Sequence, residues 1–400
     1  MLALLSPGQG AQKPGFLQPW LAAVPTAEAR LRWWSVLAGV DLVHLGTAAD
    51  EDEIKDTART QPLLVATALL AAEQLSSVRP APGVDPLPEV AVVGGHSVGE
   101  LAAAALAGAL TPEAAVALAG VRGREMAAAC ALKPTGMAAV LGGDESEVLA
   151  AIEAHGLHPA NRNGAGQIVA AGPTEALTAF AAAPPAKARV RPLAVAGAFH
   201  TPYMAPAEQA LGVVAEGIVP ADPVRLLLSN LDGTCVDSGR ELIRRLVTQV
   251  TAPVRWDACM RTLVDLGVTA VIELPPAGTL ANLIKREFKG GPCPEIVTLN
   301  TPDDLPAARD LIARHGGVSS DEPAPQFRLV VANASGTFSP AAGLAEGDQV
   351  RAGQVLGQVV TRQGPVEVAA HDAGVLLEWL AHQDDPVAPG QPLARIGGQS

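Results

Sequence analysis

Short apolar runs alternate with longer amphipathic or alanine-rich stretches through the first three quarters of the chain. Leu2 to Leu5, Ala91 to Val93 and Val268 to Leu274 have the length of buried strands, and Pro62 to Leu75 has the length of a helix. Such alternation favours a parallel sheet with helices on both faces. We therefore predict an α/β domain over residues 1–300.

The pattern changes between Gly136 and Ala198. It predicts the order strand, helix, strand, strand, helix, strand, which is the ferredoxin-like arrangement. The six segments are Gly136–Leu141, Glu145–His155, His158–Asn163, Gln167–Ala171, Thr174–Ala183 and Val190–Val195. We predict a small inserted subdomain at about residues 127–198, and clefts tend to form at such junctions.

The pattern of apolar and polar residues changes again in the last quarter of the chain. Residues 301–326 predict a short helix followed by a polar linker. Residues 327–397 consist of short strands and glycine turns, and Gly347 to Leu356 is echoed 37 residues later by Asp384 to Arg395. The repeat predicts a small β-barrel or sandwich of two related halves.

One glycine-flanked serine stands between a predicted strand and a predicted helix. The segment Gly95-His96-Ser97-Val98-Gly99 follows Ala91 to Val93 and precedes the alanine-rich run from Leu101 to Leu110. This context is typical of a nucleophile elbow, in which a strained turn exposes the serine hydroxyl. We predict a nucleophilic serine in an α/β-hydrolase-like domain. The alternative is a glycine-rich turn without chemistry.

Composition narrows the function classes. The net charge of −13 argues against broad binding to nucleic acid or to an anionic membrane. Ser6-Pro7-Gly8 ends the first apolar run, so no signal peptide is expected, and Leu101 to Leu110 is too short to span a bilayer. The cysteines show neither metal-ligand nor disulfide spacing, which favours reduced thiols in a cytoplasmic protein. They are Cys130, Cys235, Cys259 and Cys293.

A nucleophilic serine needs a base, and the chain has eight histidines. Successive side chains of an extended segment point to opposite faces, so His96 should face away from Ser97 and be structural. His200 lies at the exit of the predicted subdomain, where a hinge would return it to the cleft. His200 is therefore the candidate base, and a buried structural histidine is the alternative.

A set of short motifs carries a family resemblance. In order along the chain they are Gly8-Gln9-Gly10-Ala11-Gln12, Thr60-Gln61-Pro62, Gly95-His96-Ser97-Val98-Gly99-Glu100, Arg122-Gly123-Arg124-Glu125-Met126, Asn161-Arg162-Asn163, Gly197-Ala198-Phe199-His200 and Gln249-Val250-Thr251-Ala252-Pro253-Val254. Over residues 1–300 the sequence resembles the malonyl-CoA:acyl carrier protein transacylases and the related acyltransferase domains of polyketide synthases. Their order and spacing make the resemblance specific.

The resemblance implies a role for each catalytic position. Ser97 resembles the nucleophile and His200 the general base, while the backbone carbonyl of Gln249 replaces a triad carboxylate in orienting the imidazole. The backbone N–H groups of Gln9 and Val98 match the oxyanion-hole donors. Val98 is plausible without the resemblance, because the residue after an elbow nucleophile commonly supplies one donor.

The resemblance also implies a substrate site. Arg122 resembles the arginine that grips the free carboxylate of the malonyl group, for which a guanidinium fork is suited. Gln61 and Asn161 resemble supporting cleft residues, and Phe199 resembles a bulky residue that disfavours an α-methyl branch without excluding it. Without the resemblance these residues would read as a surface charge, turn-capping side chains and a core ring.

The implied reaction is a ping-pong transfer of malonyl from malonyl-CoA to the phosphopantetheine thiol of an acyl carrier protein. It serves fatty-acid or polyketide synthesis and needs no permanent cofactor and no metal. Such carriers are acidic, so an acidic enzyme needs a local basic patch to dock them. The candidates are Arg244, Arg245, Lys285, Arg286 and Lys289. Ordinary surface charge is the alternative reading of these residues.

Residues 327–397 resemble the biotinyl/lipoyl carrier domain through two glycine-containing half-motifs. In that family the modified lysine lies on a hairpin between the halves, and Gln363 stands near that position here. No lysine follows Lys289, so amide attachment of biotin or lipoate to this segment is chemically impossible. We predict a docking or oligomerisation role, with an inert tail as the alternative.

Two further functions compete for the first 300 residues. A serine hydrolase of acyl esters would leave Arg122 without a carboxylate to bind, and a non-catalytic scaffold would not need Ser97, His200 and Gln9 together. Transferase and hydrolase differ in the fate of the acyl-enzyme, since transfer requires a slow reaction with water and a fast one with thiol.

Overall fold

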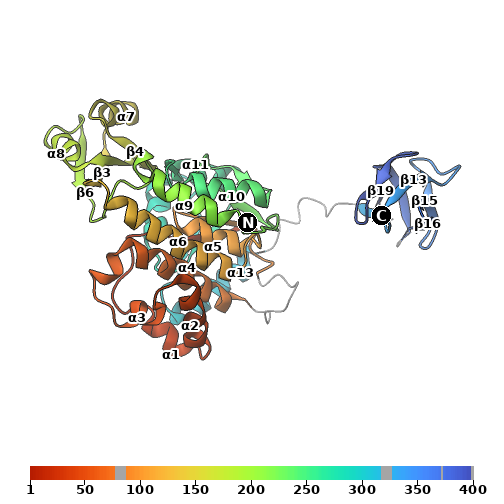
Figure 1. The fold of residues 1–400 in the computed structure, drawn as a ribbon, viewed down its shortest axis with the longest axis horizontal. Coiled ribbons are helices and arrows are strands. Elements are labelled where there is room, and N and C mark those ends of the chain that lie inside the picture. Colours follow the sequence, from red (N-terminus) through yellow and green to blue (C-terminus); the bar gives the residue numbers. More distant parts are fainter. Residues whose placement is uncertain (77–86, 317–326, 371–372, 398–400) are drawn as a thin grey trace. The chain divides into compact units, whose positions relative to one another are not determined.

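The computed structural model describes residues 1–76, 87–316, 327–370 and 373–397. The chain forms two compact units, Met1–Val318 and Ser319–Ser400 (Figure 1). The predicted linker at residues 317–326 lies outside the described residues. Within the described residues, no helix combines the length and apolar character needed to cross a membrane.

A six-stranded sheet forms the centre of unit 1, and it confirms the predicted parallel α/β domain. Its strand order is β11-β10-β1-β2-β7-β8, and every neighbouring pair is parallel except β7 and β8. Leu2 to Leu5 are wholly buried because β1 lies inside the sheet with both faces covered. The strands are β1 (Leu2–Ser6), β2 (Val92–Gly95), β7 (Leu226–Leu228), β8 (Cys235–Val236), β10 (Ala270–Glu273) and β11 (Glu295–Thr298).

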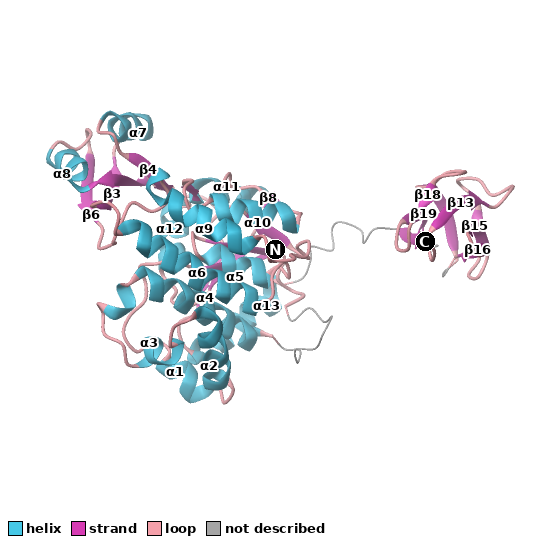
Figure 2. Cartoon of the chain, in the orientation of Figure 1, coloured by secondary structure: helices cyan, strands magenta, loops and turns pink. Residues whose placement is uncertain are grey.

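Helices cover both faces of this sheet (Figure 2). Leu2 and Leu4 point into a large core with the N-terminal helices, whereas Ala3 and Leu5 pack with Trp256 on the opposite face. The helices are α1 (Gln18–Ala23), α2 (Ala27–Ala38), α3 (Leu42–Thr47), η1 (Glu53–Lys55), α4 (Thr57–Leu75), α5 (Gly99–Leu106), α6 (Pro112–Cys130), η2 (Pro202–Met204), α9 (Ala205–Ala215), α10 (Gly239–Thr248), α11 (Trp256–Asp265), α12 (Thr279–Glu287), η3 (Pro302–Asp304) and α13 (Leu305–His315).

Small residues let α6 approach its neighbours closely. A Cβ on Gly120 would lie 2.5 Å from the carbonyl oxygen of Ala38 in α2, and a Cβ on Gly123 would lie 2.8 Å from that of Thr57 in α4. The helix is therefore packed backbone to backbone at these points. This packing fixes the position of Arg122, which lies between the two glycines.

The short helix predicted at the start of residues 301–326 is present as α13, and it packs on unit 1. Its residues Leu305, Ala308, Leu311 and Ile312 are buried in the main core of unit 1. Arg309 also donates a hydrogen bond to the carbonyl oxygen of Gln74 at 2.7 Å. The amphipathic pattern of this helix thus completes the first unit.

A second sheet builds the small subdomain, where α7 lies beside β4 and α8 beside β3 and β6 (Figure 1). Its order is β6-β3-β5-β4-β9, and neighbouring pairs among the first four strands are antiparallel. Strand β9 joins it in parallel from outside the insertion. The elements are β3 (Thr135–Gly142), α7 (Glu145–Ala154), β4 (His158–Arg162), β5 (Gln167–Pro173), α8 (Thr174–Ala182), β6 (Ala188–Pro192) and β9 (Val254–Arg255).

Two boundaries of this subdomain differ from the sequence prediction. Residues 127–130 belong to α6, because the alanine-rich helix continues to Cys130. Strand β6 ends at Pro192 rather than Val195, although the N–H of Leu193 still donates to the carbonyl oxygen of Met137 in β3 at 2.9 Å. Leu193 and Val195 line a cleft instead.

Unit 2 consists of two four-stranded sheets with the orders β12-β19-β17-β14 and β16-β15-β13-β18. Its core contains Phe338, Leu356, Val359, Leu376 and Leu393. The strands are β12 (Phe327–Val331), β13 (Gly336–Pro340), β14 (Gln349–Val350), β15 (Val355–Thr361), β16 (Gly364–Ala369), β17 (Gly374–Trp379), β18 (Pro386–Val387) and β19 (Pro392–Gly397).

The sequence repeat of unit 2 is also a repeat of turn geometry. Asp348 and Asp385 each accept a hydrogen bond from the backbone N–H three residues earlier, at 2.8 and 2.7 Å. Gln354 and Gln391 do the same at 3.0 and 3.1 Å. Each half-motif therefore contains the same two turns, and in each turn a side-chain oxygen accepts a hydrogen bond from a backbone N–H.

Candidate active site

Ser97 lies at the turn between β2 and α5. Its φ is +55°, a left-handed conformation that costs an ordinary residue about 1–3 kcal/mol. A Cβ on Gly95 would lie 2.0 Å from the backbone carbon of Gly99, and a Cβ on Gly99 would lie 2.3 Å from the carbonyl oxygen of Ser6. Only glycine fits at both positions, so Gly95 and Gly99 allow the chain to form this strained turn.

Ser97 and His200 form a hydrogen-bonded dyad. Ser97 Oγ lies 2.8 Å from His200 Nε2, and His200 Nδ1 lies 2.8 Å from the backbone carbonyl oxygen of Gln249. A carbonyl oxygen only accepts, so Nδ1 carries the proton and Nε2 presents its lone pair to the serine hydroxyl. Burial, and then the positive charge of Arg122, lower the pKa of His200 to about 3.

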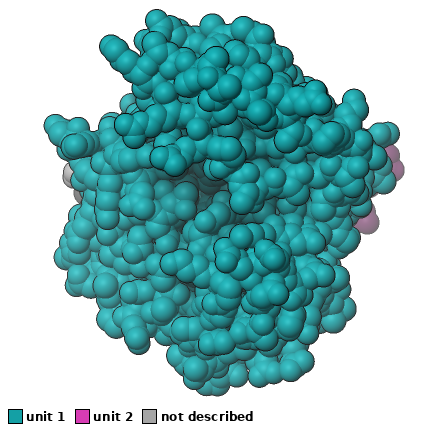
Figure 3. All heavy atoms as spheres, turned by 90° about the vertical axis from the view of Figure 1, so that its left-hand side faces the viewer, with its two compact units in different colours: residues 1–318 teal, residues 319–400 magenta. Residues whose placement is uncertain are grey.

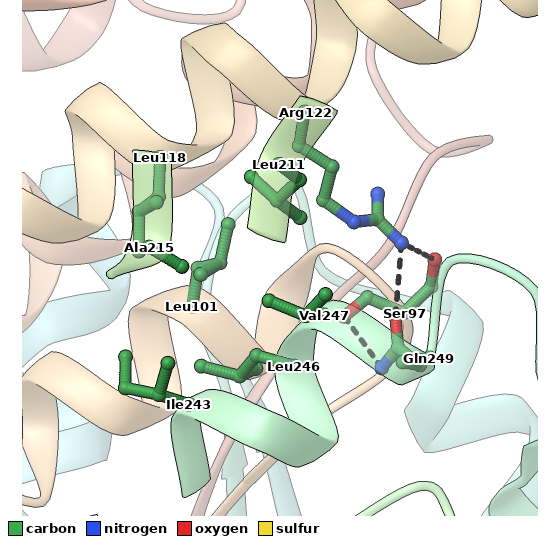
Figure 4. A pocket seen from close by; sticks show the side chains of 10 residues that line it. All are labelled: Ser97, Leu101, Leu118, Arg122, Leu211, Ala215, Ile243, Leu246, Val247 and Gln249. Atoms are coloured by element: carbon green, nitrogen blue, oxygen red, sulfur yellow. Dashed lines mark hydrogen bonds between the residues drawn. The ribbon is translucent and has the colours of Figure 1, made fainter. Parts of the chain in front are cut away.

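Arg122 is held beside the dyad by two side-chain amides. Its Nη1 donates to Gln61 Oε1 at 2.6 Å. Its Nη2 donates to Gln249 Oε1 at 2.9 Å and to Ser97 Oγ at 3.4 Å (Figure 4). The residue is only 3% exposed. Among the described residues, no carboxylate lies within ion-pair distance of this guanidinium. Burial lowers its pKa to about 10, so it remains a cation at neutral pH.

Apolar side chains close the space behind Arg122. The cavity there has about 10 Å³, room for one water molecule and not for an acyl chain. Figure 4 shows its walls coming from α5, α6, α9 and α10. They are Leu101, Leu118, Leu211, Ala215, Ile243, Leu246 and Val247. The guanidinium is therefore desolvated on this side and faces Ser97 on the other.

Unit 1 is hollowed on the face shown in Figure 3. A cleft of about 430 Å³ reaches the dyad from solvent, at the junction of the two sheets. Besides Ser97 and His200, it is lined by Gln9, His96, Asn161, Phe199, Leu193, Val195, Asn282 and Arg286, among others. Gln9, Asn161 and Phe199 thus meet at one cleft. Val98 is buried at the start of α5, immediately after the nucleophile.

His96 bonds to a partner other than Ser97, although it also lines the cleft. Its Nε2 lies 3.0 Å from Asn163 Oδ1, and its ring meets the edge of Trp256 with the centroids 5.7 Å apart. Burial lowers the pKa of His96. These contacts give it a structural place between the elbow and the small subdomain.

The five basic residues proposed for carrier docking fall into two groups. Arg244 and Arg245 lie in α10, where both bind Glu241 and Arg245 also binds Asp232. Lys285 and Arg286 lie exposed in α12, and Lys289 is exposed just beyond its end. Arg286 borders the cleft and donates to Gln167 Oε1 at 2.5 Å. Arg286 therefore places the second group at the cleft, whereas neither arginine of the first group lines it.

Asn230 and Glu100 are buried polar residues of the site that the sequence analysis did not find. Asn230 follows the end of β7, and its side chain contacts the turn that carries Ser97. The sequence offered only a weak indication of Asn230, namely the polar pair Ser229-Asn230 at the carboxyl end of an apolar strand. No three potential metal-ligating side chains gather in the part of the chain that the structure describes.

The α/β fold and the Ser97–His200 dyad define a serine enzyme that can accept an acyl group, and comparison with known proteins assigns it to the acyl transferases. The model of the acyl transferase domain matches residues 5–311, so the chain belongs to the acyl transferase family. It is similar to the malonyl CoA-acyl carrier protein transacylases. That of Mycobacterium tuberculosis is 53% identical over 305 residues, covering 76% of this chain and 98% of the relative. That of Escherichia coli is 33% identical over 291 residues, covering 71% and 92%.

Solved structures show the same likeness. The crystal structure of the Mycobacterium tuberculosis enzyme has a TM-score of 0.72 and 52% identity, covering 77% of this chain and 99% of that one. A malonyl-transacylase in complex with its type II PKS acyl-carrier protein has a TM-score of 0.69 and 29% identity, covering 77% and 99%.

Proposed function

We propose that this enzyme transfers a malonyl group from malonyl-CoA to the phosphopantetheine thiol of an acyl carrier protein, through a malonyl ester on Ser97. The observation that carries the proposal is the guanidinium of Arg122, buried without a directly bonded carboxylate and 3.4 Å from Ser97 Oγ. A buried cation beside a nucleophile fits an acyl group with its own carboxylate. The named activity of the similar transacylases supports the same substrate.

In the first half-reaction His200 takes the proton of Ser97, and Oγ attacks the thioester carbonyl. The tetrahedral oxyanion is held by the backbone N–H groups of Gln9 and Val98. Collapse breaks the carbon–sulfur bond, and the imidazolium returns the proton to the departing CoA sulfur. The carbonyl of Gln249 holds the imidazole in the tautomer that this exchange requires.

In the second half-reaction the carrier thiol gives its proton to His200 and attacks the malonyl ester. A new carbon–sulfur bond forms, the bond to Ser97 Oγ breaks, and the same proton returns to Oγ. The cycle uses no permanent cofactor. Through both steps Gln61 and Gln249 hold Arg122 against the malonyl carboxylate.

Specificity at the α-carbon is assigned to the cleft wall. Phe199 is 6% exposed, lines the cleft and precedes His200. Its ring crowds a methyl branch, and one methyl is worth about 1–3 kcal/mol of discrimination. Asn161, buried on β4, supports the same wall.

The direct test follows labelled malonyl from malonyl-CoA onto a holo acyl carrier protein. Labelled carrier is expected only when the phosphopantetheine thiol is present, so apo carrier is the control. Release of free malonate with no labelled carrier would replace the proposal by a hydrolase.

Acylation is expected to continue at pH values where an ordinary histidine is protonated. Because burial holds the pKa of His200 at about 3, the neutral imidazole persists from pH 7 down to about pH 5. The measurement is the single-turnover acylation rate at saturating malonyl-CoA across this range. A rate that falls to half near pH 6.5 would show that His200 titrates normally in the working enzyme.

Carrier docking is assigned to the basic group formed by Lys285 and Arg286 of α12 and by Lys289 just beyond its end. Exchanging Lys285 and Lys289 for glutamate should raise KM for the carrier by up to about tenfold, because charges at the edge of an interface attract an oppositely charged partner. KM for malonyl-CoA in the first half-reaction should stay constant. The matched control is Arg244→Glu, because Glu241 already binds that arginine. Equal effects of both changes on the carrier KM would contradict the assignment.

The proposal also assigns a fold type to the inserted subdomain and to unit 2. The strand order β6-β3-β5-β4, with α7 and α8 as crossovers, supports a ferredoxin-like insertion. The repeated turns and paired sheets of unit 2 support a biotinyl/lipoyl-like domain. Without lysine this unit carries no biotin or lipoate, and we assign it a docking or oligomerisation role.

A further inference from the structure

Asn230 contacts both sides of the turn that presents Ser97. Its Oδ1 accepts a hydrogen bond from the backbone N–H of Ser97 at 2.7 Å, and its Nδ2 donates to the carbonyl oxygen of Gly95 at 2.8 Å. The side chain is wholly buried. One amide therefore bridges two backbone groups, on Gly95 and Ser97, that lie on either side of His96 in this turn.

Asn230 is itself held at its backbone. Its N–H donates to Glu100 Oε1 at 2.6 Å, and its carbonyl oxygen accepts from the N–H of Arg255 at 2.8 Å. Glu100 is 4% exposed and lies in the first turn of α5, three residues after Ser97. The elbow, its following helix and the end of β7 thus form one closed hydrogen-bonded ring.

The chemistry of the turn explains why an amide is needed. The left-handed φ of Ser97 persists only if the surrounding structure enforces it. The N–H of Ser97 needs an acceptor and the carbonyl of Gly95 needs a donor, and an asparagine side chain offers both on one rigid plane. Alanine at position 230 would leave two buried backbone groups unpaired.

We propose that Asn230 is a positioning residue for the nucleophile, and that Glu100 anchors it. The contact with the N–H of Ser97 fixes where Oγ points and where the next N–H, that of Val98, is presented. The inference rests on the proposed function for its substrate, but not for the reactivity of Ser97.

The test therefore uses two readouts on the full chain. The first is the rate at which phenylmethylsulfonyl fluoride labels Ser97, which reports the nucleophile without reference to malonyl. The second is the steady-state kcat and KM for malonyl-CoA. Asn230→Ala is expected to lower the labelling rate and kcat by about 100-fold, since small misplacement of a reacting atom has that cost. KM for malonyl-CoA should stay within about threefold.

The matched control is Ser229→Ala. Ser229 is a buried neighbour whose hydroxyl accepts from the N–H of Leu231 at 3.3 Å and does not reach the elbow. It should stay within about twofold of the wild type in both readouts. Equal losses in both variants would reduce Asn230 to a general structural role and overturn the proposal.

Two further variants decide the matter if Asn230→Ala does not fold. Asn230→Asp keeps the shape but turns an oxygen toward the carbonyl of Gly95, and it should slow labelling as well. Glu100→Gln keeps an acceptor for the N–H of Asn230 and should retain most of the rate that Glu100→Ala loses. Labelling of folded Asn230→Asp at the wild-type rate would overturn the proposal. Wild-type labelling by the sulfonyl fluoride without malonylation would instead refute the proposed function.

Discussion

Ser97→Ala is expected to remove all covalent malonyl from the enzyme and to lower turnover by at least about 10⁴-fold. The reason is that Oγ is the atom that bonds to the acyl group, and alanine offers His200 no proton to accept. The left-handed turn and its hydrogen bond to Asn230 involve the backbone of this residue rather than Oγ, so the fold should persist. The measurement is the intact mass of the protein after incubation with malonyl-CoA.

The control for this change is Ser229→Ala, another buried serine next to the site, which should carry one malonyl group like the wild type. A malonyl adduct of undiminished yield on Ser97→Ala would show that the acyl group is attached elsewhere.

Arg122→Ala is expected to abolish the preference for malonyl over acetyl. Truncating one partner of a buried charged pair costs about 2–5 kcal/mol, which corresponds to roughly 30- to 5,000-fold in kcat/KM for malonyl-CoA. Acetyl-CoA has no carboxylate to lose, so its kcat/KM should change by less than about tenfold. Arg122→Lys should not restore the preference, because a single ammonium cannot replace the fork bound by Gln61 and Gln249.

The measurement is the ratio of kcat/KM for the two thioesters in each variant. Arg124→Ala is the matched control, because Arg124 lies in the same helix, is exposed and binds the carbonyl of Ala38. A malonyl-to-acetyl ratio that survives in Arg122→Ala would remove the guanidinium from the substrate site.

The sheet and the elbow could be predicted because their signals are local. Leu2 to Leu5 are continuously apolar since β1 is buried on both faces, and the turn at Ser97 has glycines wherever a Cβ would collide with backbone. The candidate site residues could be predicted because they belong to short sequence motifs. In the structure, His200 contacts both Ser97 and the backbone carbonyl of Gln249.

Long-range pairing could not be predicted in the same way. Asn230 and Ser97 are 133 residues apart, and no local pattern connects the amide with the turn that it holds. The ion pair between Arg245 and Asp232 likewise joins residues of different elements, and the local sequence around either residue does not show it. The helix α13 was predicted from its local pattern, but an amphipathic pattern does not show which core its apolar side chains enter.

The central claim is that Ser97 carries malonyl between two thiols, and the most direct measurement is the fate of that adduct. The enzyme is charged with malonyl-CoA, freed of excess substrate and mixed with holo acyl carrier protein while both intact masses are recorded over time. We predict that the malonyl mass leaves the enzyme and appears on the carrier, and that it stays on the enzyme when apo carrier is added. Loss of the adduct at the same rate with either carrier, with no gain in carrier mass, would contradict the account.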